Sequence, residues 1–228
     1  MNFASGLVSN ITQSTRAAID VGSTPADVKW DICERMDFLI QYCVPSNWLM
    51  AEHVRENGVA IQAVPPPTGE GDLKPSVHGI SINCFAYMKQ VKEPNCGKLL
   101  HTFLRRFNAS VNNSLEIISE AAVKTTNTVL RAPAELEDNH DKETGEGSIC
   151  ALLAQQLKCA VAEFSFTPAP GQPLARGLCR AFYNSNKRFH YVVVVAVPAE
   201  EYEVAQDLVI HALVAVVEGR VEAAAKRT

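Results

Sequence analysis

Four cations interleaved with aromatic side chains are the residues of this sequence whose types and spacing best suggest chemistry. The cations are Arg176, Arg180, Lys187 and Arg188. The aromatic residues among them are Phe182, Tyr183, Phe189 and Tyr191. Such a mixture can stack on single-stranded nucleic acid or form ion pairs with an acidic protein. In extended strands, alternation sends the aromatic side chains toward the core and the cations toward water. We therefore favour a solvated sheet edge or a site for an acidic protein partner.

A run of three prolines is the second candidate for partner binding. Pro65, Pro66 and Pro67 favour the extended polyproline II conformation. An aromatic groove of another protein can bind such a segment. A stiff surface connection would use the same residues, and we favour that interpretation while keeping the three prolines as candidates.

The patterns that usually mark an active site are missing from the sequence. It contains no GxSxG, HExxH, GxxxxGK[ST], GxGxxG or CxxC. Two of the histidines, His190 and His211, lie in a predicted strand and helix, where a structural role is more common than catalysis. A thiolate pair is conceivable only if His101 approaches Cys84 or Cys96. We predict a protein without catalytic residues, metal ligands or cofactor.

Composition narrows the classes of partner and compartment. The chain has 228 residues and a net charge of −4, which argues against a nucleic-acid partner. Seven dispersed cysteines without closely spaced pairs predict buried free thiols in a reducing compartment such as the cytoplasm. No apolar run is long enough to span a membrane. Only Arg16 is charged before Asp20, which predicts a docking arm or short helix and leaves organelle targeting open.

The C-terminal strand and helix are the elements around which the rest must be arranged. Residues 191–197 are all apolar, as in a central strand covered on both faces. Pro198 ends this strand because it cannot donate a hydrogen bond. Acidic residues then open a helix whose apolar positions recur through Val217, and Gly219 stands where a cap is expected.

The other elements follow from alternation and turn residues. Strands are predicted over residues 36–44, 58–64, 77–90, 158–166 and 178–183, and a helix over residues 94–108. Residues 36–64 are predicted to form a loose hairpin, and residues 26–36 a helical turn around Trp30. Residues 115–130 fit either strands or a helix, and we favour strands. Residues 149–157 are left as helix or strand.

These elements predict one α+β domain over residues 26–220. Residues 1–25 form the predicted N-terminal arm, and residues 221–228 form a tail. Two loops interrupt the domain, a proline- and glycine-rich one at residues 65–76 and an acidic one at residues 133–148. The acidic loop lacks the spacing of a calcium-binding loop.

The order of elements and two corners resemble the superfamily of the photosystem extrinsic protein PsbP. The corners are Val44–Trp48 (VPSNW) and Val197–Glu203. The superfamily includes a Ran-binding nuclear transport factor and the Eag-type chaperones of secretion effectors. Over residues 36–218, the resemblance implies an antiparallel β-sheet sandwiched by helices and a role in binding other proteins. It implies no catalytic residue.

The sequence therefore suggests a non-enzymatic protein-binding module, as a structural subunit or adaptor of a multi-subunit complex. A chaperone of the secretion-effector type, which could be a homodimer, is the first alternative. A small-molecule-binding or enzymatic domain with a pocket on the sheet face is the second.

Overall fold

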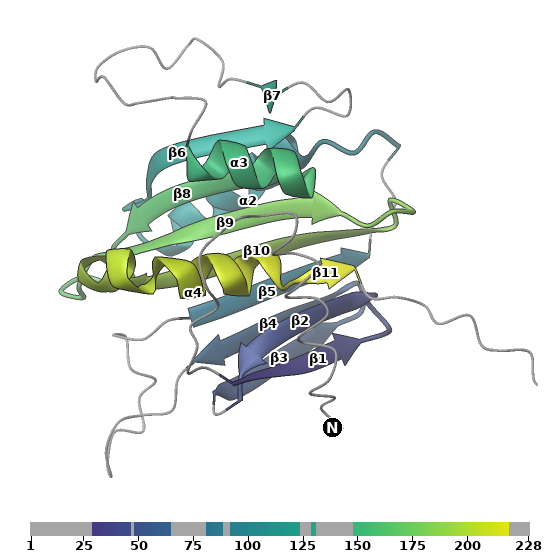
Figure 1. Ribbon diagram of the computed structural model, residues 1–228, viewed down its shortest axis with the longest axis horizontal. Helices are drawn as coiled ribbons and strands as arrows, with labels where there is room; N and C mark the ends of the chain where they lie inside the picture. Colours follow the sequence, from purple (N-terminus) through teal and green to yellow (C-terminus); the bar gives the residue numbers. More distant parts are fainter. Residues whose placement is uncertain are drawn as a thin grey trace, which may run out of the picture.

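The computed structural model describes residues 29–46, 48–64, 81–88, 92–123, 129–130 and 148–218 (Figure 1). The predicted N-terminal arm, the triple proline, nearly all of the acidic loop and the C-terminal tail lie outside these residues. Within the described ranges, no helix is both long enough and apolar enough to cross a membrane.

The strands form two antiparallel sheets. The large sheet has the order β3-β4-β5-β10-β9-β8-β6-β7, and the small sheet has the order β1-β2-β11. The strands of the large sheet are β3 (Leu49–Arg55), β4 (Gly58–Val64), β5 (Ser81–Met88), β6 (Glu116–Val123), β7 (Val129–Leu130), β8 (Ala160–Phe166), β9 (Ala175–Tyr183) and β10 (Phe189–Pro198). Those of the small sheet are β1 (Trp30–Arg35), β2 (Ile40–Pro45) and β11 (Val217–Glu218).

Strand β10 lies in the middle of the large sheet, as its unbroken apolar run predicts. It pairs with β5 on one side and β9 on the other. Every residue from Tyr191 to Pro198 is buried. Pro198 is the last residue of the strand, and the short helix η2 (Ala199–Glu201) begins directly after it.

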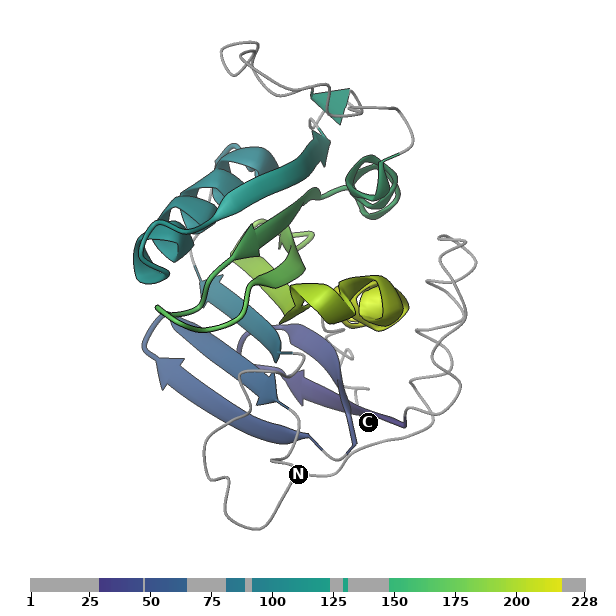
Figure 2. The ribbon, with the colours of Figure 1, turned by 90° about the vertical axis from the view of Figure 1, so that its left-hand side faces the viewer.

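Helices cover both faces of the large sheet (Figure 2). Helix α2 (Cys96–Ser110) lies on one face, where Leu100 and Leu104 are buried among residues of β8, β9 and β10. Helices α3 (Ile149–Leu157) and α4 (Tyr202–Val214) lie on the other face, and the small sheet packs beside α4. The α+β fold with an antiparallel sheet between helices is thus confirmed.

The segment with an ambiguous pattern is a strand where the structure describes it. Residues 116–123 form β6, which pairs with β8. Residues 124–128 lie outside the described part. Residues 149–157 are a helix because Ser148 caps it, its Oγ accepting a hydrogen bond from the Ala151 N–H at 3.2 Å.

The predicted hairpin over residues 36–64 is wrong. Residues 36–39 form a turn with Leu39 at φ 48°, so β2 folds back on β1 and joins the small sheet. The helical turn predicted around Trp30 is the strand β1. A separate hairpin joins β3 to β4 through the Asn57-Gly58 turn, in which Arg55 pairs with Gly58.

Helix α4 is shorter than its apolar pattern predicts. It ends at Val214, and Val217 and Glu218 instead pair with Gln41 and Ile40 of β2. Arg180 provides the physical reason, because its guanidinium Nη1 donates to the carbonyl oxygens of Leu213 and Val216 at 3.2 and 2.9 Å. These side-chain hydrogen bonds satisfy carbonyls that a longer helix would have paired internally.

Candidate protein-binding surface

The β9–β10 hairpin is held by its own turn residues. The Asn184 Oδ1 accepts hydrogen bonds from the Arg188 and Phe189 N–H groups at 3.0 and 2.9 Å. The Lys187 N–H donates to the Asn184 carbonyl at 3.0 Å, and Lys187 itself has φ 59°. These internal hydrogen bonds fix the backbone that carries Lys187 and Arg188.

The small sheet also holds the turn of this hairpin, through Glu218 of β11. The Ser185 N–H and Oγ donate to the two carboxylate oxygens of Glu218 at 2.9 and 2.8 Å. Glu218 belongs to β11, which pairs with β2. The hairpin, the end of α4 and the small sheet are therefore linked through one carboxylate.

Lys187 and Arg188 are exposed at the tip of this hairpin, as predicted. Neither forms an ion pair with any residue in the described ranges. Their charges are thus available to a partner.

The other two predicted cations are used inside the molecule. The prediction that all four face water is wrong for Arg180, which is 5% exposed and lies over the Phe182 ring at 4.2 Å. Burial lowers the pKa of Arg180 from its ordinary value because the charged form is desolvated. Strand alternation shows which residues share a face of the strand, but not whether another element covers that face. The end of α4 covers the face of β9 that carries Arg180.

Arg176 is half-buried and holds strand β8 and helix α4 together. Its guanidinium lies 2.6 Å from a carboxylate oxygen of Glu163 and 2.9 Å from one of Glu203. It also lies over the Tyr202 ring at 4.2 Å. Of the four cations proposed to bind a partner, only Lys187 and Arg188 keep an unpaired, exposed charge.

A row of residues across five strands borders the hairpin tip. Successive register pairs connect Arg55 to Gly58, Gly58 to Tyr87, Tyr87 to His190, and His190 to Tyr183. Directly paired residues of antiparallel strands project from the same face, so this row runs across the end of the sheet on one side. The sequence could not show the row, because it depends on the pairing of strands distant along the chain.

Tyr87 is clamped within this row. Its ring stacks on the His190 ring, with centroids 5.2 Å apart and planes 25° apart. On the opposite strand, a Cβ atom added to Gly58 would lie 3.1 Å from the Cδ1 of Tyr87. The ring therefore lies against a glycine, as aromatic residues do when they cover an unprotected stretch of backbone.

We call the exposed end of this row, together with the hairpin tip, the hairpin-end surface. It consists of Arg55, Tyr87, Lys187 and Arg188, and it is bordered by Met88 of β5, which projects from the opposite face of the sheet. Tyr87 is 40% and Met88 42% exposed. Tyrosine and arginine are enriched in protein interfaces, so the composition of this surface suits contact with another protein.

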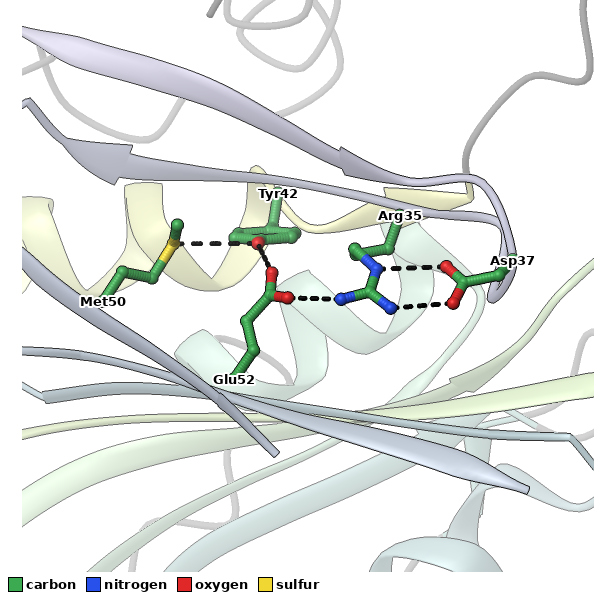
Figure 3. Close-up of polar contacts among 5 residues, drawn as sticks. All are labelled: Arg35, Asp37, Tyr42, Met50 and Glu52. Carbon is green, nitrogen blue, oxygen red and sulfur yellow. Dashed lines mark hydrogen bonds and ion pairs between the residues drawn. The ribbon is translucent and has the colours of Figure 1, made fainter. Parts of the chain in front are cut away.

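A polar cluster attaches the edge strand β3 to the small sheet (Figure 3). The Glu52 carboxylate accepts hydrogen bonds from the Arg35 guanidinium and, at 3.0 Å, from the Tyr42 hydroxyl. Arg35 also pairs with Asp37 at 2.7 Å and holds the pKa of that carboxyl below its ordinary value. The Tyr42 hydroxyl also lies 3.7 Å from the Met50 sulfur.

This cluster is structural, because both of its carboxylates are bonded to the single guanidinium of Arg35. Glu52 points inward from an edge strand and meets a cation from β1. Inward-pointing charges on edge strands oppose uncontrolled pairing with other chains. The cluster therefore holds in place the strand that carries Arg55.

The thiolate pair considered for His101 has no support at Cys96, and the Cys84 side chain lies outside the described part of the structure. Burial raises the pKa of Cys96 and Cys150 to about 11, so both thiols are protonated at neutral pH. His101 lies 3.1 Å from Glu120. No group of three or more metal-binding side chains occurs among the described residues.

Comparisons with known proteins give structural neighbours only. No protein-family model matches the sequence, and no curated protein matches it. Among solved structures, cyanobacterial PsbP (CyanoP) from Synechocystis sp. PCC 6803 is 6% identical, with a TM-score of 0.49, covering 88% of this chain and 99% of its own. The Ran-binding protein Mog1p from Saccharomyces cerevisiae is 10% identical, with a TM-score of 0.48, covering 84% of this chain and 96% of its own. These are the two kinds of protein that the sequence resemblance named.

Proposed function

We propose that this protein is a non-enzymatic protein-binding module, a structural subunit or adaptor of a larger assembly that docks its partner on the hairpin-end surface. One observation carries the proposal. Lys187 and Arg188 stand on a turn fixed by Asn184 and Glu218 and have no internal ion-pair partner within the described residues. A surface ordered before binding loses little conformational entropy when the partner docks.

The free cysteines support a reducing compartment such as the cytoplasm. Cys33, Cys43, Cys150, Cys159 and Cys179 are buried free thiols. Proteins of oxidising compartments more commonly carry disulfides.

The chaperone alternative would need an apolar groove on the open part of the sheet. On β3 and β4, the side chains in register with the Arg55 row include Leu49, which is 54% exposed, and the exposed Ala51, His53 and Gln62. Leu49 is the only exposed large apolar side chain among them, and its partner Val64 on β4 is half-buried. This composition favours a polar contact over the capture of an apolar segment.

The test is a tagged purification of three forms of the protein from its native cell, followed by mass spectrometry. The forms are the wild type, the double variant Lys187→Glu/Arg188→Glu, and the double variant Arg105→Glu/Arg106→Glu. Arg105 and Arg106 are exposed on α2 and serve as a control with the same change of charge.

We expect a stoichiometric partner with the wild type and the α2 variant, and its loss from the hairpin variant. A partner retained equally by all three forms would exclude the hairpin-end surface. Purification of the wild type without any partner, at low as well as high salt, would overturn the adaptor function itself.

A further inference from the structure

We infer that the hairpin-end surface binds an acidic, extended segment of a protein partner, laid across the strand ends from Arg55 to the hairpin tip. This inference rests on the proposed function and adds the chemistry of the partner. Charge, length and the packing of Tyr87 each support it.

The charge of this end of the molecule differs from that of the whole chain. The chain carries a net charge of −4. Among the described residues, five exposed cations stand at the ends of the strands and of the helix near this surface. They are Arg55, Lys92, Lys98, Lys187 and Arg188. The exposed carboxylates in the same segments are Glu56 and Glu93. Three further carboxylates at this end are already bonded within the molecule: Glu34 to Gln41, Asp37 to Arg35 and Glu218 to Ser185. An excess of cations on an acidic protein provides complementarity to an acidic partner.

Helix α2 adds to the positive potential at the far end of the row. Tyr183 lies near the start of this helix, close to the Asn95 backbone. The first turn of α2 contains no acidic residue. The positive end of the helix dipole is therefore not offset by a carboxylate of the first turn.

The row also sets the length of the segment. It crosses five strands, from β3 to β9. Four spacings of ~4.8 Å amount to about 19 Å, which an extended chain covers with roughly six residues. A segment of this length can place carboxylates near Arg55 and near the hairpin tip at the same time.

The packing of Tyr87 favours a peptide over single-stranded nucleic acid. Nucleic-acid bases bind aromatic side chains by stacking on an open ring face. One face of Tyr87 lies on His190, and its other side lies against Gly58. The ring thus offers its exposed edge and hydroxyl group, which suit hydrogen bonds and side-chain contacts with a peptide.

Fluorescence anisotropy with three labelled probes tests the inference on the full chain. The first probe is a peptide of about eight residues, slightly longer than the span, with glutamates around a central Tyr-Pro pair. The second replaces every glutamate with glutamine, and the third is an oligothymidine of matched length. The variants are Lys187→Glu/Arg188→Glu, Arg55→Glu, and the α2 control Arg105→Glu/Arg106→Glu.

We expect the glutamate peptide to bind the wild type at least about tenfold more tightly than the glutamine peptide does. The hairpin variant and Arg55→Glu should each weaken binding about tenfold, and the α2 control should not. Equal weakening by the α2 control would show unspecific charge attraction, and tighter binding of oligothymidine would show a nucleic-acid site. Either result overturns the inference.

The two proposals can fail separately. If the native partner depends on Lys187 and Arg188 but the glutamate peptide binds no better than the glutamine peptide, the adaptor function stands and the acidic segment is wrong. If no partner is recovered, the adaptor function fails regardless of what the peptides do.

Discussion

Arg180 carries a positive charge into the core, and its position explains how α4 and the small sheet are joined. Its guanidinium is surrounded by the backbone carbonyls of Leu213, Val214 and Val216 and by the Phe182 ring, with no carboxylate among its hydrogen-bond partners in the described residues. The negative end of the α4 dipole supplies the compensating potential. A cation in this place fixes where the helix stops and β11 begins.

Replacing Arg180 should destabilise the protein more than replacing an exposed arginine of the same hairpin. The substitution Arg180→Leu leaves the carbonyls of Leu213 and Val216 without their donor, and we expect a loss of about 2–3 kcal/mol in the free energy of unfolding. Arg188→Leu, at the exposed tip, should change it by less than about 0.5 kcal/mol. Urea denaturation measures both, and equal effects would contradict the capping role of Arg180.

At the scale of elements, the large sheet depends on close contact between β9 and β10. Gly177 of β9 lies opposite Ala196 of β10, and a Cβ atom added there would come 2.2 Å from the Val195 carbonyl oxygen. That oxygen belongs to the central strand, which cannot move without disturbing both of its neighbours. Only glycine fits at this position.

The substitution Gly177→Ala should therefore lower the free energy of unfolding by about 2–3 kcal/mol, by forcing the backbones of β9 and β10 apart. Gly171→Ala is the control, since a Cβ atom there meets nothing within 4 Å and the only penalty comes from its φ of +80°. We expect that control to lose about 1 kcal/mol. Thermal or urea denaturation that ranked the two substitutions in the opposite order would refute the packing argument.

The Arg35–Glu52 pair should contribute more to stability than the Arg35–Asp37 pair. The side chains of Arg35 and Glu52 are 20% and 16% exposed, whereas that of Asp37 is 52% exposed. Double-mutant cycles with Arg35→Met, Glu52→Gln and Asp37→Asn should give a coupling of about 1–2 kcal/mol for the first pair and below about 0.5 kcal/mol for the second. A larger coupling for Asp37 would show that the inward-pointing glutamate does not tie β3 to the small sheet.

At the scale of the whole molecule, the elements that could be predicted from the sequence are those that local patterns determine. The apolar run of β10 required a strand covered on both faces, and the proline and acidic residues after it required a change to helix. The small sheet was missed for two reasons: the turn at residues 36–39 that pairs β1 with β2 carries no glycine or proline, and the third strand depends on Val217 pairing with Gln41 across most of the chain. The apolar pattern through Val217 predicted a helix where the structure has strand β11.

The candidate surface was predicted only in part for the same reason. Lys187 and Arg188 stand next to a turn that the sequence shows directly. Arg55 and Tyr87 join them only through the pairing of β3, β4, β5 and β10. The triple proline at residues 65–67 lies outside the described residues, so its role in partner binding stays a prediction.

The most direct test of the adaptor function is the reactivity of lysines in the assembled complex. The protein is treated with an amine-modifying reagent, alone and in native extract, and the modification of each lysine is quantified by mass spectrometry. We predict that Lys187 becomes protected in the extract while Lys158, exposed at the end of α3, stays reactive. Unchanged reactivity of Lys187, in extract where the protein migrates as part of a larger complex, would contradict docking at the hairpin-end surface.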